Sequence, residues 1–201
     1  MKYPCGMLSS IAKFILKIGG WSFNGYTPSE PKFIMLAAPH TAFIDGFWMV
    51  VGGFAFNIRP AFLVKATYIK GLLGRVILFF GDIPVVSGAK ANKVAETIDM
   101  IKQKSEMKLV IAPEGTRIKR DHWRSGFYHI GRAANLPIYL SYLDFGKREL
   151  GVHPDPVHLT GNMTADMDII RRFYAGKRGR HPEMQSPIRL RDEELVLTTD
   201  E

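Results

Sequence analysis

A histidine and an aspartate five residues apart could form a catalytic pair. His40 follows an apolar run over residues 33–38 that predicts a buried strand, and Asp45 falls in the first turns of the helix predicted next. A carboxylate near an imidazole selects the tautomer of the ring and stabilises the imidazolium that forms when the ring accepts a proton. The pair is therefore a candidate general base. The alternative is an acidic residue at a helix N-terminus beside a surface histidine.

A second polar cluster follows another predicted strand. Glu114, Gly115, Thr116 and Arg117 follow Pro113 and the strand predicted over residues 108–112, of which 109–112 are apolar. Glycine lets a ligand approach the backbone closely, threonine supplies a hydroxyl group, and arginine supplies the two-pronged donor that suits a phosphate. The cluster predicts an anion-binding loop. A polar turn between a strand and a helix is the alternative.

The elements that would position these clusters alternate along the chain. Strands are expected over 33–38, 61–65, 83–86, 108–112 and 137–143, and helices over 42–56, 71–80, 89–104, 126–134 and 163–175. This alternation is typical of an α/β fold, here a single domain with a mostly parallel central sheet flanked by helices. Sites in such sheets gather at the carboxyl ends of the strands. His40, Lys65, Ser87 and Glu114 all fall at or just past such ends.

The N-terminal residues 7–18 predict an amphipathic helix. Its apolar positions include Leu8, Ile11 and Ile15, whereas Lys13 and Lys17 fall on the opposite face. The sequence supports two interpretations of this helix equally. The apolar face packs on the core of the protein, or it lies in a lipid interface with the lysines directed to headgroups.

Composition and charge narrow the class of protein further. The chain has 201 residues, 46% of them hydrophobic, with one cysteine and a net charge of +8. These values exclude wholesale disorder, an internal disulfide and a cysteine-based zinc site. No stretch has the roughly 20 apolar residues of a membrane-spanning helix, and no signal peptide is expected. Residues 1–178 carry a net charge of +11 and residues 179–201 carry −3, which favours an anionic partner: nucleic acid, a lipid surface or a phosphorylated molecule.

Taken together, the two clusters resemble the motifs of the glycerolipid acyltransferase family, the 1-acyl-glycerol-3-phosphate acyltransferase-like enzymes. The His-x4-Asp motif of that family corresponds to His40 and Asp45, and its Glu-Gly-Thr-Arg motif matches residues 114–117 without a change. Three further blocks agree in order, Phe-Leu-Val-Lys at 62–65, Gly-Asp-Ile-Pro-Val-Val at 81–86 and Leu-Pro-Ile at 136–138. The resemblance extends over residues 33–140, about half of the chain.

This resemblance implies a reaction and a role for each residue. His40 would act as general base on the hydroxyl group of a lysophospholipid-type acceptor, which attacks the thioester of acyl-CoA or acyl carrier protein, and Asp45 would orient His40. No cofactor or metal ion is implied beyond the acyl donor. The implied substrate-binding residues are Lys65, Glu114, Gly115, Thr116 and Arg117, with Arg117 and Lys65 on the acceptor phosphate.

One position departs from the family pattern. Ser87 stands where the family usually has an arginine that helps to hold the phosphate of the acceptor. Ser87 and the nearby Arg75 are therefore candidates for setting acceptor specificity.

The resemblance also implies an organisation and a set of partners. We expect an amphipathic membrane-surface segment over 1–24, an acyltransferase domain over 25–176 and a mobile polar tail over 177–201. The expected partners are an anionic membrane surface, the acyl donor and a lysolipid, which would place the protein in the cytoplasm on the inner face of a membrane, in phospholipid biosynthesis or remodelling. Nucleic acid is not expected, because the basic residues are dispersed and no nucleic-acid-reading motif is present. The alternative function is a non-catalytic basic module that binds lipid or nucleic acid.

Overall fold

A seven-stranded sheet forms the centre of the described part of the chain, which in this computed structural model comprises residues 5–65, 83–85 and 90–193. In chain order the strands are β1 (Ser22–Gly25), β2 (Lys32–Ala38), β3 (Ala61–Lys65), β4 (Ile83–Val85), β5 (Met107–Ile111), β6 (Ile138–Asp144) and β7 (Glu149–Val152). Their order across the sheet is β1-β7-β6-β2-β5-β3-β4, and of the neighbouring pairs β6 and β7 run antiparallel while the others run parallel. The expected α/β fold with a mostly parallel sheet is confirmed.

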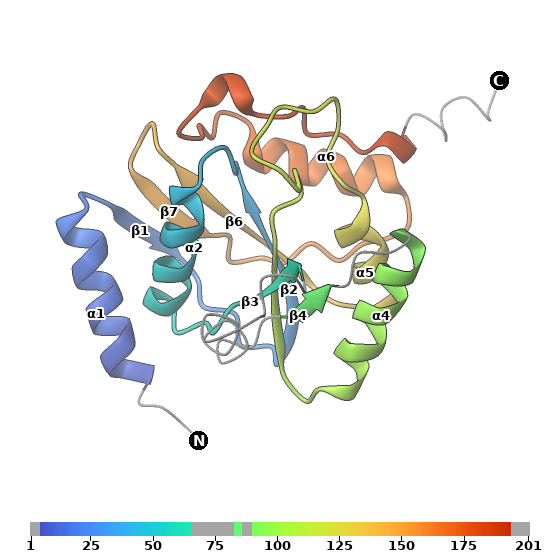
Figure 1. The fold of residues 1–201 in the computed structure, drawn as a ribbon, viewed down its shortest axis with the longest axis horizontal. Coiled ribbons are helices and arrows are strands. Elements are labelled where there is room, and N and C mark those ends of the chain that lie inside the picture. Colours follow the sequence, from blue (N-terminus) through green and yellow to red (C-terminus); the bar gives the residue numbers. More distant parts are fainter. Residues whose placement is uncertain (1–4, 66–82, 86–89, 194–201) are drawn as a thin grey trace.

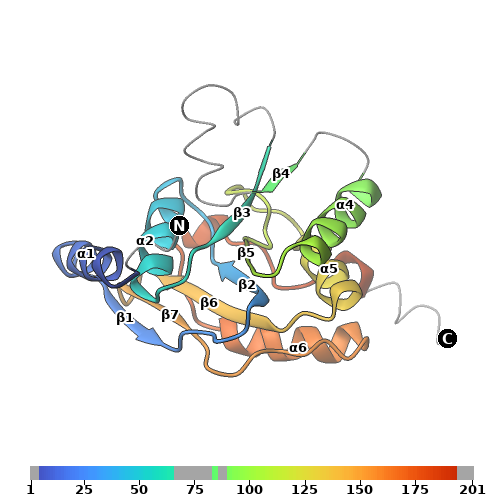
Figure 2. The same ribbon diagram turned by 90° about the horizontal axis from the view of Figure 1, so that it is seen from below.

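Helices cover both faces of this sheet (Figures 1 and 2). The helices are α1 (Cys5–Ile18), α2 (Ile44–Ala55), α4 (Lys90–Gln103), α5 (Gly126–Ala134) and α6 (Met163–Tyr174), followed by the 3₁₀ turn η2 (Pro182–Met184). Strand β2 shows how the two layers are separated, because Ile34 and Leu36 pack in the core with α4, α5 and α6, whereas Phe33 and Met35 pack with α1 and α2. This alternation is the period of two that a strand buried on both faces requires.

Helix α1 packs on the core with one side and exposes apolar side chains on the other. Leu16 is fully buried and Ala12 nearly so, both packed in the core with α2. Phe14 and Ile18 point away from that core and are 63% and 72% exposed. The apolar residues of α1 therefore surround more of the helix than one buried stripe, and part of this face is left open. No helix among the described residues is both long enough and apolar enough to cross a membrane.

The ordered domain continues past the boundary expected at residue 176. Leu190 is fully buried and forms a bridge with Trp123, and Glu193 pairs with Arg171 at 2.7 Å. The expectation of a mobile tail is thereby corrected for residues 177–193. The sequence of this stretch shows no regular apolar spacing, because individual contacts with distant residues hold it in place. The helix expected over 71–80, together with Arg75 and Ser87, lies outside the described residues.

Candidate active site

The two polar clusters meet because their strands are neighbours in the sheet. Strands β2 and β5 run parallel, with Leu36 opposite Ile111, so their carboxyl ends open on the same edge. His40 follows β2 and Glu114 follows β5. The backbone N–H of His40 donates a hydrogen bond to Oε2 of Glu114 at 2.6 Å. The expectation that both clusters share one edge of the sheet is confirmed.

Asp45 holds the turn that carries His40. Its Oδ2 accepts hydrogen bonds from the backbone N–H groups of Thr41 and Ala42, at 2.7 and 2.8 Å, and lies 3.4 Å from Nδ1 of His40. The carboxylate stands in the first turn of α2, where the helix dipole favours a negative charge. Asp45 is fully buried, so this negative charge is shielded from water and acts on its immediate neighbours.

The imidazole of His40 presents one edge to solvent. Its Nδ1 is buried on the Asp45 side, whereas the side chain as a whole retains 19% of its exposure. The accessible part of the ring is therefore the edge away from Nδ1, which carries Nε2. A distance of 3.4 Å is long for a hydrogen bond, and contacts of this kind commonly shorten when substrate binds. The geometry suits a base that takes a proton at Nε2 while Asp45 stabilises the resulting charge.

Glu114 is not at the surface. It lies next to the His40 turn and is only 2% exposed. Burial is the main cause that raises the pKa of Glu114 to about 8. The negative charge of Asp45 raises this pKa as well, whereas the backbone hydrogen bond from His40 lowers it. The carboxyl group is thus mostly neutral at pH 7. The resemblance implied a substrate-binding residue, and the contact that the structure shows for Glu114 is with the backbone of His40.

The residues after Glu114 form an exposed loop beside the start of α2. Gly115 has a φ of +63°, a left-handed conformation that favours glycine. Oγ1 of Thr116 accepts a hydrogen bond from the backbone N–H of Ile118 at 3.3 Å and so helps to shape the turn. Arg117 is exposed, and its guanidinium group lies 5.5 Å from the centre of the Phe43 ring. This contact places the cation next to the His40 turn and leaves its donors accessible.

The remaining predicted site residues are placed less completely. Lys65 is the last residue of β3, which pairs with β5, so its backbone lies at the same edge of the sheet as the two clusters. Its side chain lies outside the described residues, as do Ser87 and Arg75.

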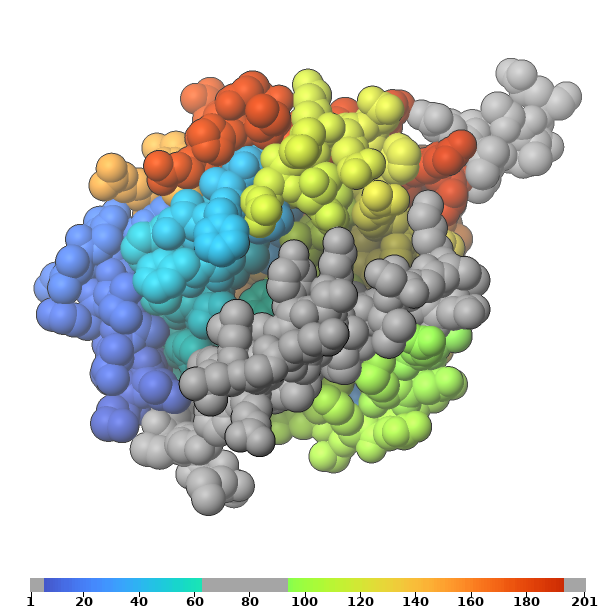
Figure 3. Space-filling model, in the orientation of Figure 1, coloured from blue at the N-terminus to red at the C-terminus, as the bar shows by residue number. Residues whose placement is uncertain are grey.

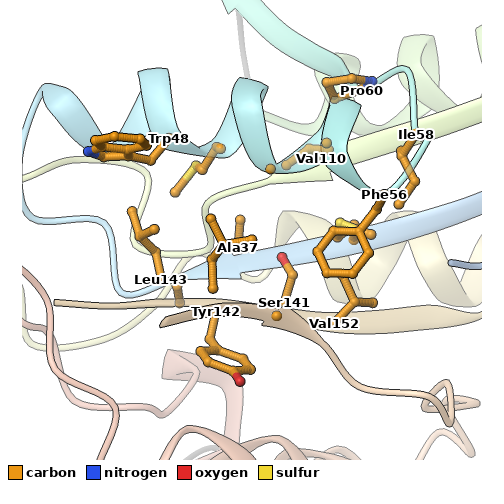
Figure 4. A pocket seen from close by; sticks show the side chains of 17 residues that line it. Ala37, Trp48, Phe56, Ile58, Pro60, Val110, Ser141, Tyr142, Leu143 and Val152 are labelled. Carbon is orange, nitrogen blue, oxygen red and sulfur yellow. The ribbon is translucent and has the colours of Figure 1, made fainter. Parts of the chain in front are cut away.

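An apolar cavity lies between α2 and the sheet (Figure 4). Helix α2 contributes Trp48, Met49, Gly52 and Gly53 to its wall, beginning one helical turn after Asp45. From the strands come mostly small or aliphatic residues, among them Ala37, Val110, Leu143 and Val152. In Figure 4, Trp48 stands at one end of the cavity and Phe56 at the other.

Two residues beside the pair were not singled out from the sequence. Thr41 is 4% exposed and its Oγ1 accepts a hydrogen bond from the backbone N–H of His181 at 3.1 Å. Phe43, at 84% exposure, is the aromatic partner of Arg117. Both lie inside the His-x4-Asp motif, so their position was visible in the sequence, although their contacts were not.

Comparison with known proteins identifies a shared fold. No protein-family model matches the chain, and no curated protein matches it by sequence. The crystal structure of the 1-acyl-sn-glycerophosphate (LPA) acyltransferase PlsC from Thermotoga maritima is similar, with a TM-score of 0.59 and 15% sequence identity, over 85% of this chain and 78% of that one. At this identity the likeness concerns the arrangement of the chain. The architecture that carries His40 and Glu114 is thus one that this acyltransferase also has.

Proposed function

We propose that this protein is an acyltransferase that moves a fatty acyl group from acyl-CoA or acyl carrier protein to the hydroxyl group of a lysophospholipid-type acceptor. The observation that carries the proposal is the pairing of a part-exposed His40 with the buried Asp45, next to the exposed cation of Arg117. The similar fold of the solved acyltransferase supports the same reaction class.

The proposed chemistry needs one base and no covalent enzyme intermediate. Nε2 of His40 takes the proton of the acceptor hydroxyl group as its oxygen attacks the thioester carbonyl carbon. The carbon–sulfur bond then breaks, and the proton passes from His40 to the departing thiolate. Asp45 stabilises the imidazolium that exists between these two transfers. Proton transfer by a positioned base typically contributes about 10²–10⁴-fold to the rate.

The acceptor phosphate would bind at the loop after β5. Arg117 offers two parallel donors to phosphate oxygens, and Lys65 at the end of β3 would add a second cation. Gly115 and Thr116 would line this pocket. Ser87 and Arg75 would set the preference among acceptor headgroups, since the missing arginine at position 87 leaves one phosphate contact to be supplied elsewhere.

Only a short part of the acyl chain would enter the cavity under α2, whose volume is about 40 Å³. This cavity is bounded almost entirely by carbon atoms, and it starts one turn from Asp45. Each methylene group moved from water into such surroundings gains about 0.8 kcal/mol. The few acyl carbons that fit this cavity would therefore supply binding energy close to the reacting carbonyl group.

The membrane would be contacted by exposed apolar side chains on α1 and α2. These are Met7, Leu8, Ile11, Phe14 and Ile18 of α1, with Phe43, Ile44 and Phe47 at the start of α2. Both helices and the loop after β5 are visible on one face of the molecule (Figure 3). Together with the net charge of +11 over residues 1–178, this supports peripheral binding to an anionic leaflet, on the cytoplasmic side, with basic residues adding about 1 kcal/mol each near the surface.

A thiol-release assay tests the proposed reaction. Purified protein is given acyl-CoA or acyl carrier protein with a panel of acceptors: lysophosphatidate, lysophospholipids and lyso-aminolipids. We expect acceptor-dependent release of free thiol that is reduced at least about 100-fold in His40→Ala. Undiminished release by His40→Ala would refute the assignment of the base. Liposome binding without turnover of any acceptor would favour the non-catalytic lipid-binding alternative.

A matched pair of variants tests the membrane surface. Ile11 on α1 is 49% exposed and Ile169 on α6 is 44% exposed. Ile11→Ser should weaken binding to anionic vesicles about fivefold, because half-burying an isoleucine is worth about 1 kcal/mol. Ile169→Ser should bind like the unaltered protein. Equal effects of the two substitutions would contradict this location of the surface.

A further inference from the structure

The segment that follows α6 contacts the turn of the catalytic histidine. The backbone N–H of His181 donates to Oγ1 of Thr41 at 3.1 Å. Gly179 is buried against the same side chain, and a Cβ atom at this position would lie 2.6 Å from Oγ1 of Thr41 and 3.2 Å from Cβ of Pro39. Real Cβ atoms do not approach other atoms to 2.6 Å, so the segment reaches its place on the turn because residue 179 has no side chain.

Internal hydrogen bonds give this part of the segment a defined shape. The side chain of Gln185 accepts from the backbone N–H of Gly179 at 2.9 Å and donates to the carbonyl oxygen of Lys177 at 3.1 Å. The backbone N–H of Phe145 donates to the carbonyl oxygen of Arg178 at 2.8 Å, which ties the segment to the end of β6. Gly179 and His181 are therefore presented to Thr41 by a closed and anchored loop.

The second half of the segment contacts the loop that continues from Arg117. Oγ of Ser186 accepts from the backbone N–H of Arg120 at 3.0 Å. Further on, the backbone N–H of Trp123 donates to the carbonyl oxygen of Arg189 at 2.8 Å, and Leu190 is fully buried. The segment therefore crosses from the His40 turn to the loop after β5, along one side of the domain (Figure 1).

Three sets of contacts consequently hold the short turn over 39–42. Glu114 accepts from the N–H of His40, and Asp45 accepts from the N–H groups of Thr41 and Ala42. The third set is the contact of Thr41 with residues 179 and 181. The first two fix the backbone of the turn, and the third fixes the buried side chain of Thr41.

We infer that residues 177–190, here called the C-terminal strap, position His40 for catalysis by holding Thr41. Thr41 and Gly179 are positioning residues in this role, since they act through the turn. The inference rests on the proposed function of His40 as the base. Its structural part, a dependence of the His40 ring position on the strap, can be measured without any substrate.

Four substitutions separate positioning from general stability. Gly179→Ala inserts a methyl group against Thr41, whereas Gly126→Ala adds the same group where nothing lies within 4 Å. Thr41→Val keeps the shape of the side chain and removes the acceptor oxygen, whereas Thr41→Ser keeps the oxygen. The readouts are kcat and KM for thiol release, thermal unfolding, and the ring Cε1–Hε1 resonance of His40, identified by its absence from His40→Ala.

We expect Gly179→Ala and Thr41→Val to lower kcat about 10–100-fold with KM changed less than about twofold, because misplacement of a reacting group by about 1 Å can cost about 10²-fold. The His40 resonance should move in both variants, and Thr41→Ser and Gly126→Ala should resemble the unaltered protein in both readouts. A His40 resonance that is unchanged in folded Gly179→Ala and Thr41→Val would overturn the inference. If the resonance moves but the unaltered protein releases no thiol, the proposed function fails and the positioning by the strap stands.

Discussion

Replacing Glu114 by glutamine tests whether this carboxyl group is neutral in the folded protein. Burial is the main reason why the pKa of Glu114 is about 8 instead of the ordinary 4.5. Since the folded value is the higher one, the folded protein binds one more proton than the unfolded chain between these two pH values. The stability contributed by this group is complete below about pH 4.5 and is lost as the pH rises towards 8.

The magnitude follows from the two pKa values. One pKa unit corresponds to about 1.4 kcal/mol, so the free energy of unfolding should fall by about 1.4 kcal/mol per pH unit in this window, or about 5 kcal/mol in all. Glutamine does not titrate, and its Oε1 can accept the same hydrogen bond from the N–H of His40. The difference in stability between Glu114→Gln and the unaltered protein should therefore rise by about 3 kcal/mol in favour of the variant from pH 5.5 to pH 7.5.

The assay is urea unfolding followed by tryptophan fluorescence at several pH values. Other titrating groups are common to both proteins, so their contributions cancel in the difference. A Glu114→Ala variant serves as a second comparison, because it also lacks the charge but leaves the N–H of His40 without its acceptor, at a cost of about 1–3 kcal/mol. A difference between Glu114→Gln and the unaltered protein that does not change with pH would refute the reasoning, since it would mean that Glu114 is ionised in the folded state.

Two other predictions concern stability away from the site. Leu16→Ala should lower the free energy of unfolding by about 2–5 kcal/mol, whereas Phe14→Ala, on the open side of the same helix, should change it by less than about 0.5 kcal/mol in urea unfolding. Burial alone would raise the pKa of Asp166, but hydrogen bonds from Thr160, Tyr128 and Gly161 outweigh it and lower the pKa. Asp166→Asn should therefore cost about 1.5–3 kcal/mol at pH 7 and less as the pH falls below 3.8, as measured by pH-dependent unfolding.

The strands that carry the site could be predicted because they are buried on both faces. Strands β2 and β5 read as short continuous apolar runs, which is the pattern of a parallel strand covered by helices. Strands β1 and β7 were not predicted. Each of the two has four residues, and all four residues of β1 are exposed, so neither has an apolar run long enough to detect.

The sequence also left the surroundings of helix α1 undecided, for a related reason. An apolar stripe shows that a helix has an apolar face, but not which medium covers it. In the structure the stripe is divided, with Leu16 in the core and Ile18 exposed. The sequence alone therefore could not choose between the two arrangements. The structure shows packing on the core for one side of the helix, and lipid contact by the exposed side stays a prediction.

By itself the sequence determined the class of fold, the ends of the strands at which chemistry is expected, and the residues His40, Asp45 and Glu114. These features depend on local periodicity and on residue type, which are properties of short stretches of chain. Only the tertiary structure decided that β2 and β5 are neighbours, that Glu114 is buried and largely neutral, and that residues 177–190 hold Thr41. The hydrogen bond from His40 to Glu114 joins residues 74 apart and that from His181 to Thr41 joins residues 140 apart. Contacts over such separations arise from packing of the whole domain, and no local pattern encodes them.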